Sequence, residues 1–402
     1  MHGRTWAEIN LDRLGRNYHR IKDIVGNAKV LAAVKADAYG HGAVQVAHKL
    51  EKEGIDYFGV AGVEEGVELR ESGLKKPILI LSPVPFDMIG QLFEYDLIPT
   101  ISESAMIEKL SQFTKRSGQL EVHIEIDTGM TRTGFSSHLA VDRIKKIAET
   151  TGLKIGGIFS HFAVAENDPV FTMEQLTRFK KIVDELKKSG LEPPLIHIAN
   201  SAAILKFKLS HLDLVRPGLA LYGLVEGFEP ILNLKSKVVN IRKVKKGVGI
   251  SYGLKFRTRK ESIIATVSAG YGDGLPRSVS SKGEVVIRGR RAPIVGVVCM
   301  DLFMVDVTAI PEVTLNDEVV IIGEDLPAGQ VAGWADTIVY ELVTNIGPRV
   351  PRIFFEGGKV IEIRDLLKRR HPVGGNDEKA CSDSAFVTRP LRSGTGTRGQ
   401  ER

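Results

Sequence analysis

Short apolar segments and amphipathic segments alternate along the first half of the chain. The apolar segments are rich in Val, Ile and Leu, whereas the segments between them repeat apolar residues at helical spacing. Near-continuous apolar strands separated by helices predict a parallel sheet with both faces covered. Eight such units favour an α/β fold built on a (β/α)8 TIM barrel. The expected strands are residues 29–35, 57–61, 77–81, 97–101, 121–127, 155–161, 195–199 and 214–216, and the clearest helices are 12–25, 43–53, 104–115, 139–150 and 173–188.

The pattern changes after residue 226. Apolar and polar residues then alternate in short runs that are separated by turn residues, which is typical of antiparallel strands. The expected strands are 234–243, 262–268, 284–288, 293–299, 303–307, 318–322 and 352–363, with one helix at 331–342. We therefore predict a barrel over residues 1–226, a mostly antiparallel β domain over 227–365 and a disordered tail over 366–402, since the last segment has little to bury.

The charge of the chain argues against a nucleic-acid partner. The formal net charge is +6. The predicted tail holds eight basic and four acidic residues, so most of the surplus lies there and the rest of the chain is near neutral. The tail also lacks the interleaved aromatic residues that bind single-stranded nucleic acid.

The cysteine content and the apolar runs bear on location. The two cysteines, Cys299 and Cys381, argue against a disulfide framework and favour a reducing compartment. No apolar run approaches the ~18–20 residues of a membrane span, and residues 1–10 lack the apolar core of a secretory signal. We expect a cytoplasmic protein with no membrane partner.

Polar residues follow many of the predicted barrel strands. Active sites of TIM barrels lie at the carboxyl ends of the strands, so these side chains are candidates for one site. A barrel without a site would bury apolar residues there. The candidates are Lys35 and Tyr39 after the first strand, Arg132 after the fifth, His161 after the sixth, Asn200 and Ser201 after the seventh, and Arg216 and Gly218 after the eighth.

Lys35 is the most informative of these residues. It follows the apolar run 30–34, so its amine leaves a buried strand. One interpretation is a lysine whose stem is buried and whose charge reaches water. The other is a desolvated lysine with a lowered pKa, which acts as a nucleophile or forms a Schiff base. Ser201, Gly218 and Leu219 add a hydroxyl and backbone N–H groups where barrels often bind phosphate, and this combination indicates pyridoxal phosphate.

The sequence resembles the alanine racemases. The motif around the lysine, AVKADAYGHG at 33–42, is similar to their cofactor-lysine signature. The resemblance spans residues 4–364 and includes DTGMTRTG at 127–134, SHF at 160–162, ANS at 199–201, VRPG at 215–218, SYG at 251–253, GYGDG at 270–274, VCMD at 298–301 and RVPR at 349–352. The resemblance implies a pyridoxal-phosphate enzyme, with a barrel and a C-terminal β domain, that interconverts L- and D-alanine. The expected role of the product is peptidoglycan synthesis.

The resemblance also implies a role for each candidate residue. Lys35 carries the cofactor, and Arg132 meets the cofactor hydroxyl or the substrate carboxylate. Tyr252 is the second acid–base group, on the opposite face of the substrate from Lys35. Tyr252 and Met300 come from the other subunit of a head-to-tail homodimer, and Met300 contacts the substrate. The remaining cofactor-binding residues are Tyr39, Ser201, Gly218, Leu219 and Tyr340 at the phosphate, Arg216 at the pyridine nitrogen, His161 against the ring, and Asn200.

Glu125 departs from the family pattern. Many relatives have a lysine at this position, and that lysine carries a carbamate. Glu125 would supply a negative charge directly, and one hypothesis is that it orients Arg132 through a charge-assisted hydrogen bond. The alternative is an outward-facing strand residue without a role in the site.

Three other functions remain open at this stage. The same fold could serve a broader amino-acid racemase or a decarboxylase. A barrel that binds the cofactor without turnover would need no second base, so SYG at 251–253 argues against it. Nucleic-acid binding through the basic tail is the third alternative. Tyr271 and Tyr340 are expected to narrow the site and favour a substrate as small as alanine.

Overall fold

The computed structural model describes residues 3–365 and 371–372. Its first unit is a closed barrel of eight parallel strands, in the order β2-β3-β4-β5-β6-β8-β9-β10 and back to β2. All eight strands fall where the apolar segments predict them. They are β2 (Lys29–Ala33), β3 (Tyr57–Val60), β4 (Ile78–Pro83), β5 (Ile98–Ile101), β6 (Leu120–Asp127), β8 (Leu153–Phe159), β9 (Ile196–His197) and β10 (Leu214–Val215). The predicted α/β barrel is confirmed.

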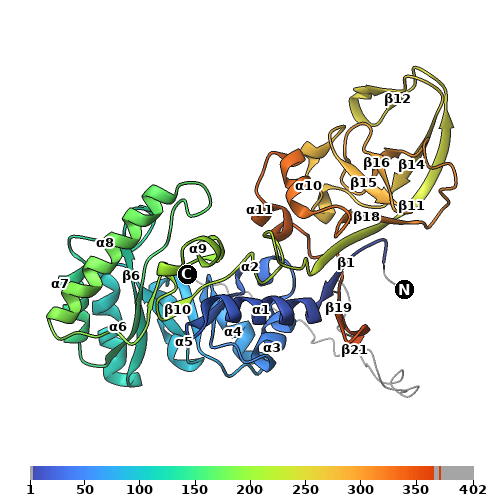
Figure 1. Cartoon of the computed structure of the whole chain (residues 1–402). Helices are drawn as coiled ribbons and strands as arrows, with labels where there is room; N and C mark the ends of the chain where they lie inside the picture. The colour runs from blue at the N-terminus through green and yellow to red at the C-terminus, as the bar shows by residue number, and fades with distance from the viewer. Residues whose placement is uncertain (1–2, 366–370, 373–402) are drawn as a thin grey trace, which may run out of the picture.

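Helices surround the barrel (Figure 1). The amphipathic faces of the longer helices pack their buried residues against the outside of the strands. The helices around the barrel are α1 (Leu11–Val25), α3 (Ala43–Lys52), α4 (Val63–Glu71), α5 (Ile89–Glu94), α6 (Ser104–Ser117), α7 (Ala140–Ala148), α8 (Pro169–Lys188) and α9 (Ser201–Lys206). The barrel interior holds a small separate apolar cluster of Leu31, Leu79, Ile98 and Leu214.

The second unit is a mostly antiparallel sheet built around the long strand β11 (Leu232–Val244). Its main path is β16-β15-β18-β11-β1-β19-β20-β21, and β14 pairs with β11 and β17 off this path. The bounds are β14 (Ser262–Val267), β15 (Glu284–Ile287), β16 (Arg290–Pro293), β17 (Phe303–Asp306), β18 (Glu318–Ile322), β19 (Arg352–Glu356), β20 (Lys359–Arg364) and β21 (His371–Pro372). A separate pair joins β12 (Gly249–Ile250) to β13 (Phe256–Arg257).

The first strand of the chain belongs to this second sheet. β1 (Thr5–Asn10) pairs antiparallel with β11 and parallel with β19, although the sequence pattern assigns residues 1–226 to the barrel. In Figure 1, β1 and β19 lie side by side at the junction of the two units, and β12 lies at the end of the β domain far from the barrel. The junction therefore joins three segments that are far apart in the chain.

Three expectations for the β domain need correction. Residues 331–342 form two helices, α10 (Ala328–Ala335) and α11 (Val339–Thr344), because Asp336 adopts a left-handed conformation with φ of 56°. Residues 352–363 form the hairpin β19–β20, which turns at Gly357 and Gly358 with φ of 59° and 72°. Residues 293–299 are mainly irregular, with one isolated bridge from Ile294 to Val305.

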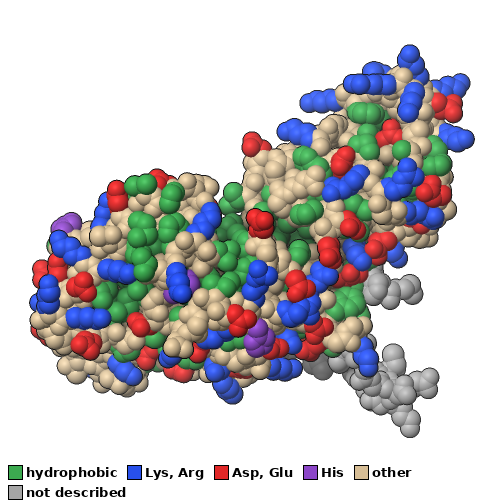
Figure 2. Space-filling model, viewed as in Figure 1, with side chains coloured by type: hydrophobic (Ala, Val, Ile, Leu, Met, Phe, Trp, Pro, Cys, Tyr) green, Lys and Arg blue, Asp and Glu red, His purple; other side chains and the backbone are tan. Residues whose placement is uncertain are grey.

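Basic side chains gather at the end of the β domain around β12 (Figure 2). Eight exposed lysines and arginines lie between residues 242 and 260, and that segment has no acidic residue: Arg242, Lys243, Lys245, Lys246, Lys255, Arg257, Arg259 and Lys260. Within the described residues, no helix is both long and apolar enough to cross a membrane. Apart from His371–Pro372, the predicted tail at 366–402 lies outside the described residues.

Candidate active site

A cavity of about 600 Å³ opens at the carboxyl ends of the barrel strands. It brings together nine of the twelve predicted site residues, and Glu125 also lines it. Tyr340 reaches it from α11 of the β domain, so both units of the chain form its wall. The nine residues are Lys35, Tyr39, Arg132, His161, Asn200, Ser201, Arg216, Gly218 and Tyr340.

Lys35 begins an unusual left-handed turn. The segment α2 (Lys35–Tyr39) has positive φ at four consecutive non-glycine residues, with values of 51° to 55° from Ala36 to Tyr39. Each such residue costs roughly 1–2 kcal/mol, because Cβ comes too close to the following carbonyl oxygen. The turn therefore needs support from outside its own sequence.

The support comes mainly from the hairpin β19–β20. Arg364 forms a two-point ion pair with Asp37, and Arg352 donates from Nε to the carbonyl of Gly40 at 3.1 Å. Both arginines are buried. Within the barrel unit, Glu65 at the start of α4 accepts from the Ala36 N–H at 2.6 Å. The β domain thus holds the turn that carries Lys35.

The surroundings of Lys35 lower its pKa. Burial is the largest cause, the positive charge of Arg132 is the next, and Arg216 adds a smaller effect. A lowered pKa leaves more of the amine neutral and nucleophilic near pH 7. Burial also lowers the pKa of His161, which lines the same cavity, to about 3. That ring is neutral, so the arginines supply the positive charge.

Arg216 lies in a web of acceptors inside the barrel. One guanidinium nitrogen donates to His197 Nδ1 at 2.7 Å, and the other donates to the Ser160 carbonyl at 2.7 Å and lies 3.2 Å from His161 Nδ1. His197 Nε2 lies 2.9 Å from His123 Nδ1. Burial lowers the pKa of Arg216 to about 10, which still leaves it charged at neutral pH. A guanidinium cannot accept a hydrogen bond, so His197 presents an unprotonated Nδ1 to it.

Hydroxyl and N–H groups gather beside Gly218. The Ser201 hydroxyl accepts from the N–H groups of Gly218 and Ala220 at 2.9 and 3.1 Å. A Cβ on Gly218 would lie 2.7 Å from the Tyr39 hydroxyl, so this position needs glycine. The Tyr340 ring lies 5.7 Å from that of Tyr39. The Gly218 N–H, a predicted phosphate donor, thus lies in one hydrogen-bonded group with Ser201.

Arg132 and Glu125 lie on one wall of the cavity. Asp127 accepts from three successive N–H groups, at residues 129 to 131, and shapes the loop that presents Arg132. Glu125 lines the cavity and is 4% exposed, which contradicts the outward-facing alternative. Its Oε2 has no hydrogen-bond partner within the described chain, and no direct bond to Arg132 is formed there. Burial raises the pKa of Glu125, although Thr133 and Arg132 act in the opposite direction.

Tyr252 and Met300 lie outside this cavity, on the surface of the β domain. Tyr252 is 71% exposed and Met300 52% exposed. Their segments touch, because the Ser251 hydroxyl donates to the Val297 carbonyl at 2.6 Å and lies 3.6 Å from the Cys299 sulfur. Among the described residues, Leu219 is the third predicted site residue that does not line the cavity.

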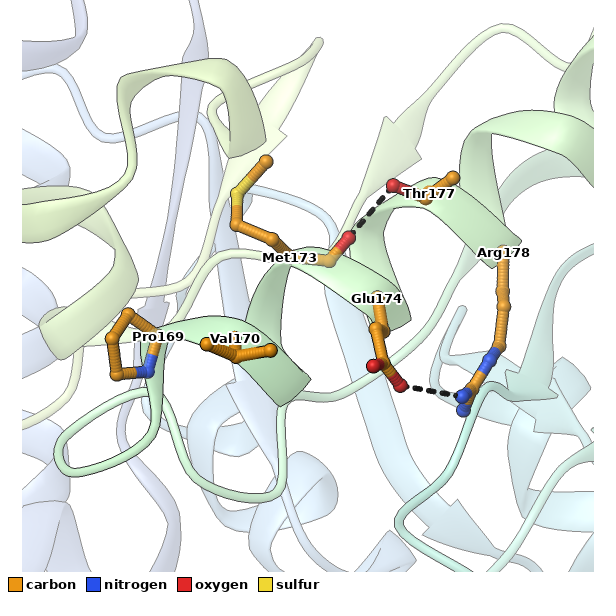
Figure 3. Close-up of a pocket in the computed structure, with 6 residues that line it drawn as sticks. All are labelled: Pro169, Val170, Met173, Glu174, Thr177 and Arg178. Carbon is orange, nitrogen blue, oxygen red and sulfur yellow. Dashed lines mark hydrogen bonds and ion pairs between the residues drawn. The ribbon is translucent and has the colours of Figure 1, made fainter.

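A second hollow lies on the surface of α8 (Figure 3). Residues 169–178 at the start of α8 line it, among them the exposed Val170, and an ion pair joins Arg178 to Glu174 at 2.9 Å. It brings together no pair of acid–base groups comparable to those around Lys35. We therefore assign the chemistry to the barrel cavity.

Comparison with known proteins agrees with this geometry. The family model described as alanine racemase, N-terminal domain, matches residues 9–226, and the model for the alanine racemase C-terminal domain matches residues 231–354. The chain belongs to the alanine racemase family. It is therefore an isomerase, and the decarboxylase and carrier alternatives are set aside.

Individual relatives of the family are similar over most of their length. The alanine racemase of Halothermothrix orenii is 45% identical over 363 residues, which cover 87% of this chain and 96% of that protein. The alanine racemase of Thermodesulfovibrio yellowstonii is 47% identical over 357 residues, covering 86% and 96%. The solved alanine racemase of Clostridium difficile 630 superposes with a TM-score of 0.87 at 36% identity and covers 92% of this chain and 100% of that one.

Sequence patterns did not reveal the residues that support the site. Asp37, Glu65, Arg352 and Arg364 hold the turn at Lys35, and His123 holds His197. No local signal marks Arg364, because its partner Asp37 lies 327 positions away. Asp37 could have been predicted to form an ion pair, since an acidic residue close to the end of a buried strand needs a partner for its charge.

The first prediction concerns the support of the turn. Arg364→Gln should lower the free energy of unfolding by roughly 2–4 kcal/mol, less than a fully buried broken pair, because the Asp37 side chain is 34% exposed. Racemase activity should fall with it, since the turn that carries Lys35 loses its brace. Arg364→Lys keeps the charge without the two-point geometry, so its stability and activity should lie between those of the parent protein and of Arg364→Gln. Thermal unfolding and alanine racemisation measure both effects.

The control for this prediction is Arg16→Gln. Arg16 forms a two-point pair with Glu229 at 2.7 Å on the surface, so its loss should cost less than ~1 kcal/mol. Equal effects of Arg364→Gln and Arg16→Gln on stability and activity would contradict the bracing role.

The second prediction concerns the buried carboxyl of Glu125. Its pKa is raised in the folded state from an ordinary value of 4.5, so its ionised form costs folding free energy at neutral pH. Glu125→Gln should therefore be more stable than the parent protein above the raised pKa, by ~1–3 kcal/mol. The difference should shrink as the pH falls toward 4.5. Urea unfolding between pH 4.5 and 8 measures it, with Glu121→Gln at the other end of β6 as the control. A constant difference across this range would show that the charge is not the cause.

Proposed function

We propose that the chain interconverts L- and D-alanine with pyridoxal 5'-phosphate, within a head-to-tail homodimer. Lys35 carries the cofactor and serves as one acid–base group, and Tyr252 of the second subunit serves as the other. The observation that supports the cofactor assignment is the cation set of the cavity. Lys35, Arg132 and Arg216 line the cavity with two carboxylates, Glu125 and Glu166, and burial of Glu125 favours its neutral form, so the surplus of positive charge suits an anionic ligand.

The donor set of the cavity fits this cofactor. Lys35 offers an amine of lowered pKa for the aldehyde group. Ser201, Tyr39 and Tyr340 offer hydroxyls to the phosphate, with Gly218 and Leu219 next to them. Arg216 can only donate to the pyridine nitrogen, so it keeps that nitrogen unprotonated. When bound, pyridoxal phosphate acidifies the Cα–H bond of the amino acid by delocalising the negative charge left on Cα.

Racemisation needs two proton carriers on opposite faces of Cα. One carrier removes the Cα proton as a base, and the other, acting as an acid, delivers a proton to the opposite face. The substrate thus keeps its composition while its configuration at Cα is inverted, and the two carriers exchange protonation states. Lys35 can serve one face, because burial and Arg132 favour its neutral form. Arg132 is free to meet the substrate carboxylate, since it lines the same cavity.

The place of Tyr252 supports the dimer. Within the described chain it does not line the Lys35 cavity, and it lies on an exposed surface of the β domain. The apolar side chains around it, Val248, Leu254 and Leu302, are each at least 39% exposed and line a second cavity of about 730 Å³. Such a surface is typical of an interface. A head-to-tail contact would bring Tyr252 and Met300 of one copy to Lys35 of the other.

The reaction is tested by the optical rotation of L-alanine. We expect it to decay to a racemic mixture with the purified protein and pyridoxal phosphate, and to persist when the cofactor has been removed by dialysis against a competing amine. Lys35→Ala should be inactive under both conditions. Decay at an equal rate without the cofactor would contradict the assignment. If the enzyme acts in the cytoplasm and supplies D-alanine for peptidoglycan, cells that lack its gene should need added D-alanine to grow.

The sharing of the site is tested by mixing two inactive variants. Lys35→Ala and Tyr252→Phe should each be inactive alone. After dissociation and reassociation, half of the dimers are mixed, and each mixed dimer has one site with both native residues. About a quarter of the activity of the native protein should therefore return. If Lys35 and Tyr252 of the same chain formed the site, the mixture would stay inactive.

A further inference from the structure

Two large apolar side chains are exposed on neighbouring loops of the β domain. Tyr271 is 43% exposed, in the loop 270–274, and Met300 is 52% exposed, in the loop 299–302. Single exposed apolar residues are common on protein surfaces. These two differ because an ion network with a buried carboxylate at its centre holds the loops that carry them.

The centre of the network is Asp273, which is 1% exposed. Its Oδ1 accepts from Arg4 at 2.8 Å and from Arg349 Nε at 2.9 Å. Its Oδ2 accepts from Arg349 at 3.3 Å and from the Gly270 N–H at 2.9 Å. A buried carboxylate is costly unless it is paired and hydrogen-bonded. Here two cations and one backbone group satisfy it.

The same two arginines also hold the backbone at Met300. Arg349 donates to the Met300 carbonyl at 3.1 Å and pairs with Asp301 at 2.8 Å. Arg4 donates to the Asp301 carbonyl at 3.0 Å. Met300 is therefore fixed at its own carbonyl and at the residue that follows it. We call Arg4, Asp273, Asp301 and Arg349 the Asp273 network.

The two loops also approach each other through their backbones. The N–H groups of Tyr271 and Gly272 donate to the carbonyls of Cys299 and Met300 at 3.0 and 2.9 Å. A Cβ on Gly270 would lie 2.3 Å from the Cys299 carbonyl oxygen, so that position has room for glycine alone. Tyr271 and Met300 are thus carried by one rigid unit, although 29 positions separate them in the chain.

We propose that Arg4, Asp273 and Arg349 are positioning residues that hold the loops of Tyr271 and Met300 in a fixed position. These two side chains thereby limit the size of the amino acid that the enzyme accepts. This inference rests on the proposed function, in which Met300 reaches the site of the second subunit. Binding of a methyl group distinguishes substrates weakly, at about 0.8 kcal/mol per buried carbon. Selection of alanine must come from exclusion of larger side chains, and exclusion requires a wall that does not yield.

A double-mutant cycle tests the inference. The variants are Arg349→Gln, Met300→Ala and the pair, and the measurement is kcat/KM for L-alanine and for L-serine in the cofactor-loaded enzyme. Arg349→Gln should lower the alanine-to-serine ratio by roughly 3–10-fold in the native background. It should have no further effect on the ratio once Met300 is alanine. Arg4→Gln, at a side chain that is 39% exposed, gives the same test with less risk to folding.

Arg288→Gln is the matched control. Arg288 pairs with Asp317 at 2.7 Å in the same domain and takes no part in the Asp273 network. Its loss should leave the ratio unchanged.

Two results would overturn the inference, and they differ from each other. The network supports the fold alone if Arg349→Gln and Arg4→Gln lower the melting temperature but leave the alanine-to-serine ratio unchanged. The same conclusion follows if they lower that ratio equally in the native and the Met300→Ala backgrounds. If Met300→Ala itself leaves the ratio unchanged, Met300 does not reach the substrate, and the proposed position of that residue fails as well.

Discussion

The left-handed turn from Lys35 to Gly40 is the constraint on which the site depends. Four consecutive non-glycine residues with positive φ would unwind in an isolated peptide. The turn persists because Arg364 and Arg352 hold it from the hairpin β19–β20, which itself pairs with β1. The barrel therefore supplies the strand that ends at Lys35, and the β domain fixes the direction in which the lysine leaves it.

The second feature of the site is a set of positive charges that the carboxylates around them do not fully balance. Arg216 is buried with neutral acceptors around it, and the histidines beside it have lowered pKa values, so it remains a cation among dipoles. Of the two carboxylates that line the cavity, Glu125 is buried and Glu166 is exposed, and Oε2 of Glu125 has no hydrogen-bond partner within the described chain. An anionic ligand would relieve this imbalance, and the same arrangement lowers the pKa of Lys35.

The sequence predicted the barrel better than the β domain for physical reasons. Most barrel strands are apolar on both faces and appear as continuous runs, although β6 alternates apolar and polar residues, and all eight strands lie where they were predicted. In the β domain the decisive features are single backbone conformations. Asp336 ends α10 and Gly357 turns the hairpin, and neither interrupts the apolar pattern strongly. The strand β1 was missed because its pairing partners lie more than 200 positions away.

The same distinction holds for the site. Residues that follow strands, such as Lys35 and Ser201, could be predicted because parallel strands end at one edge. Residues that act by contact across the chain could not, and Arg364 and Arg349 are examples. Tyr252 and Met300 came from the family resemblance, since nothing in their local pattern separates them from ordinary strand and core residues.

The most direct test of this account is the identity of the lysine that binds the cofactor. Borohydride reduction of the cofactor-loaded protein makes the bond between the lysine amine and the cofactor permanent, and peptide mass mapping then locates it. The account predicts that the reduced cofactor is attached to Lys35. Attachment to another lysine, or no attachment in a protein that racemises alanine, would contradict it.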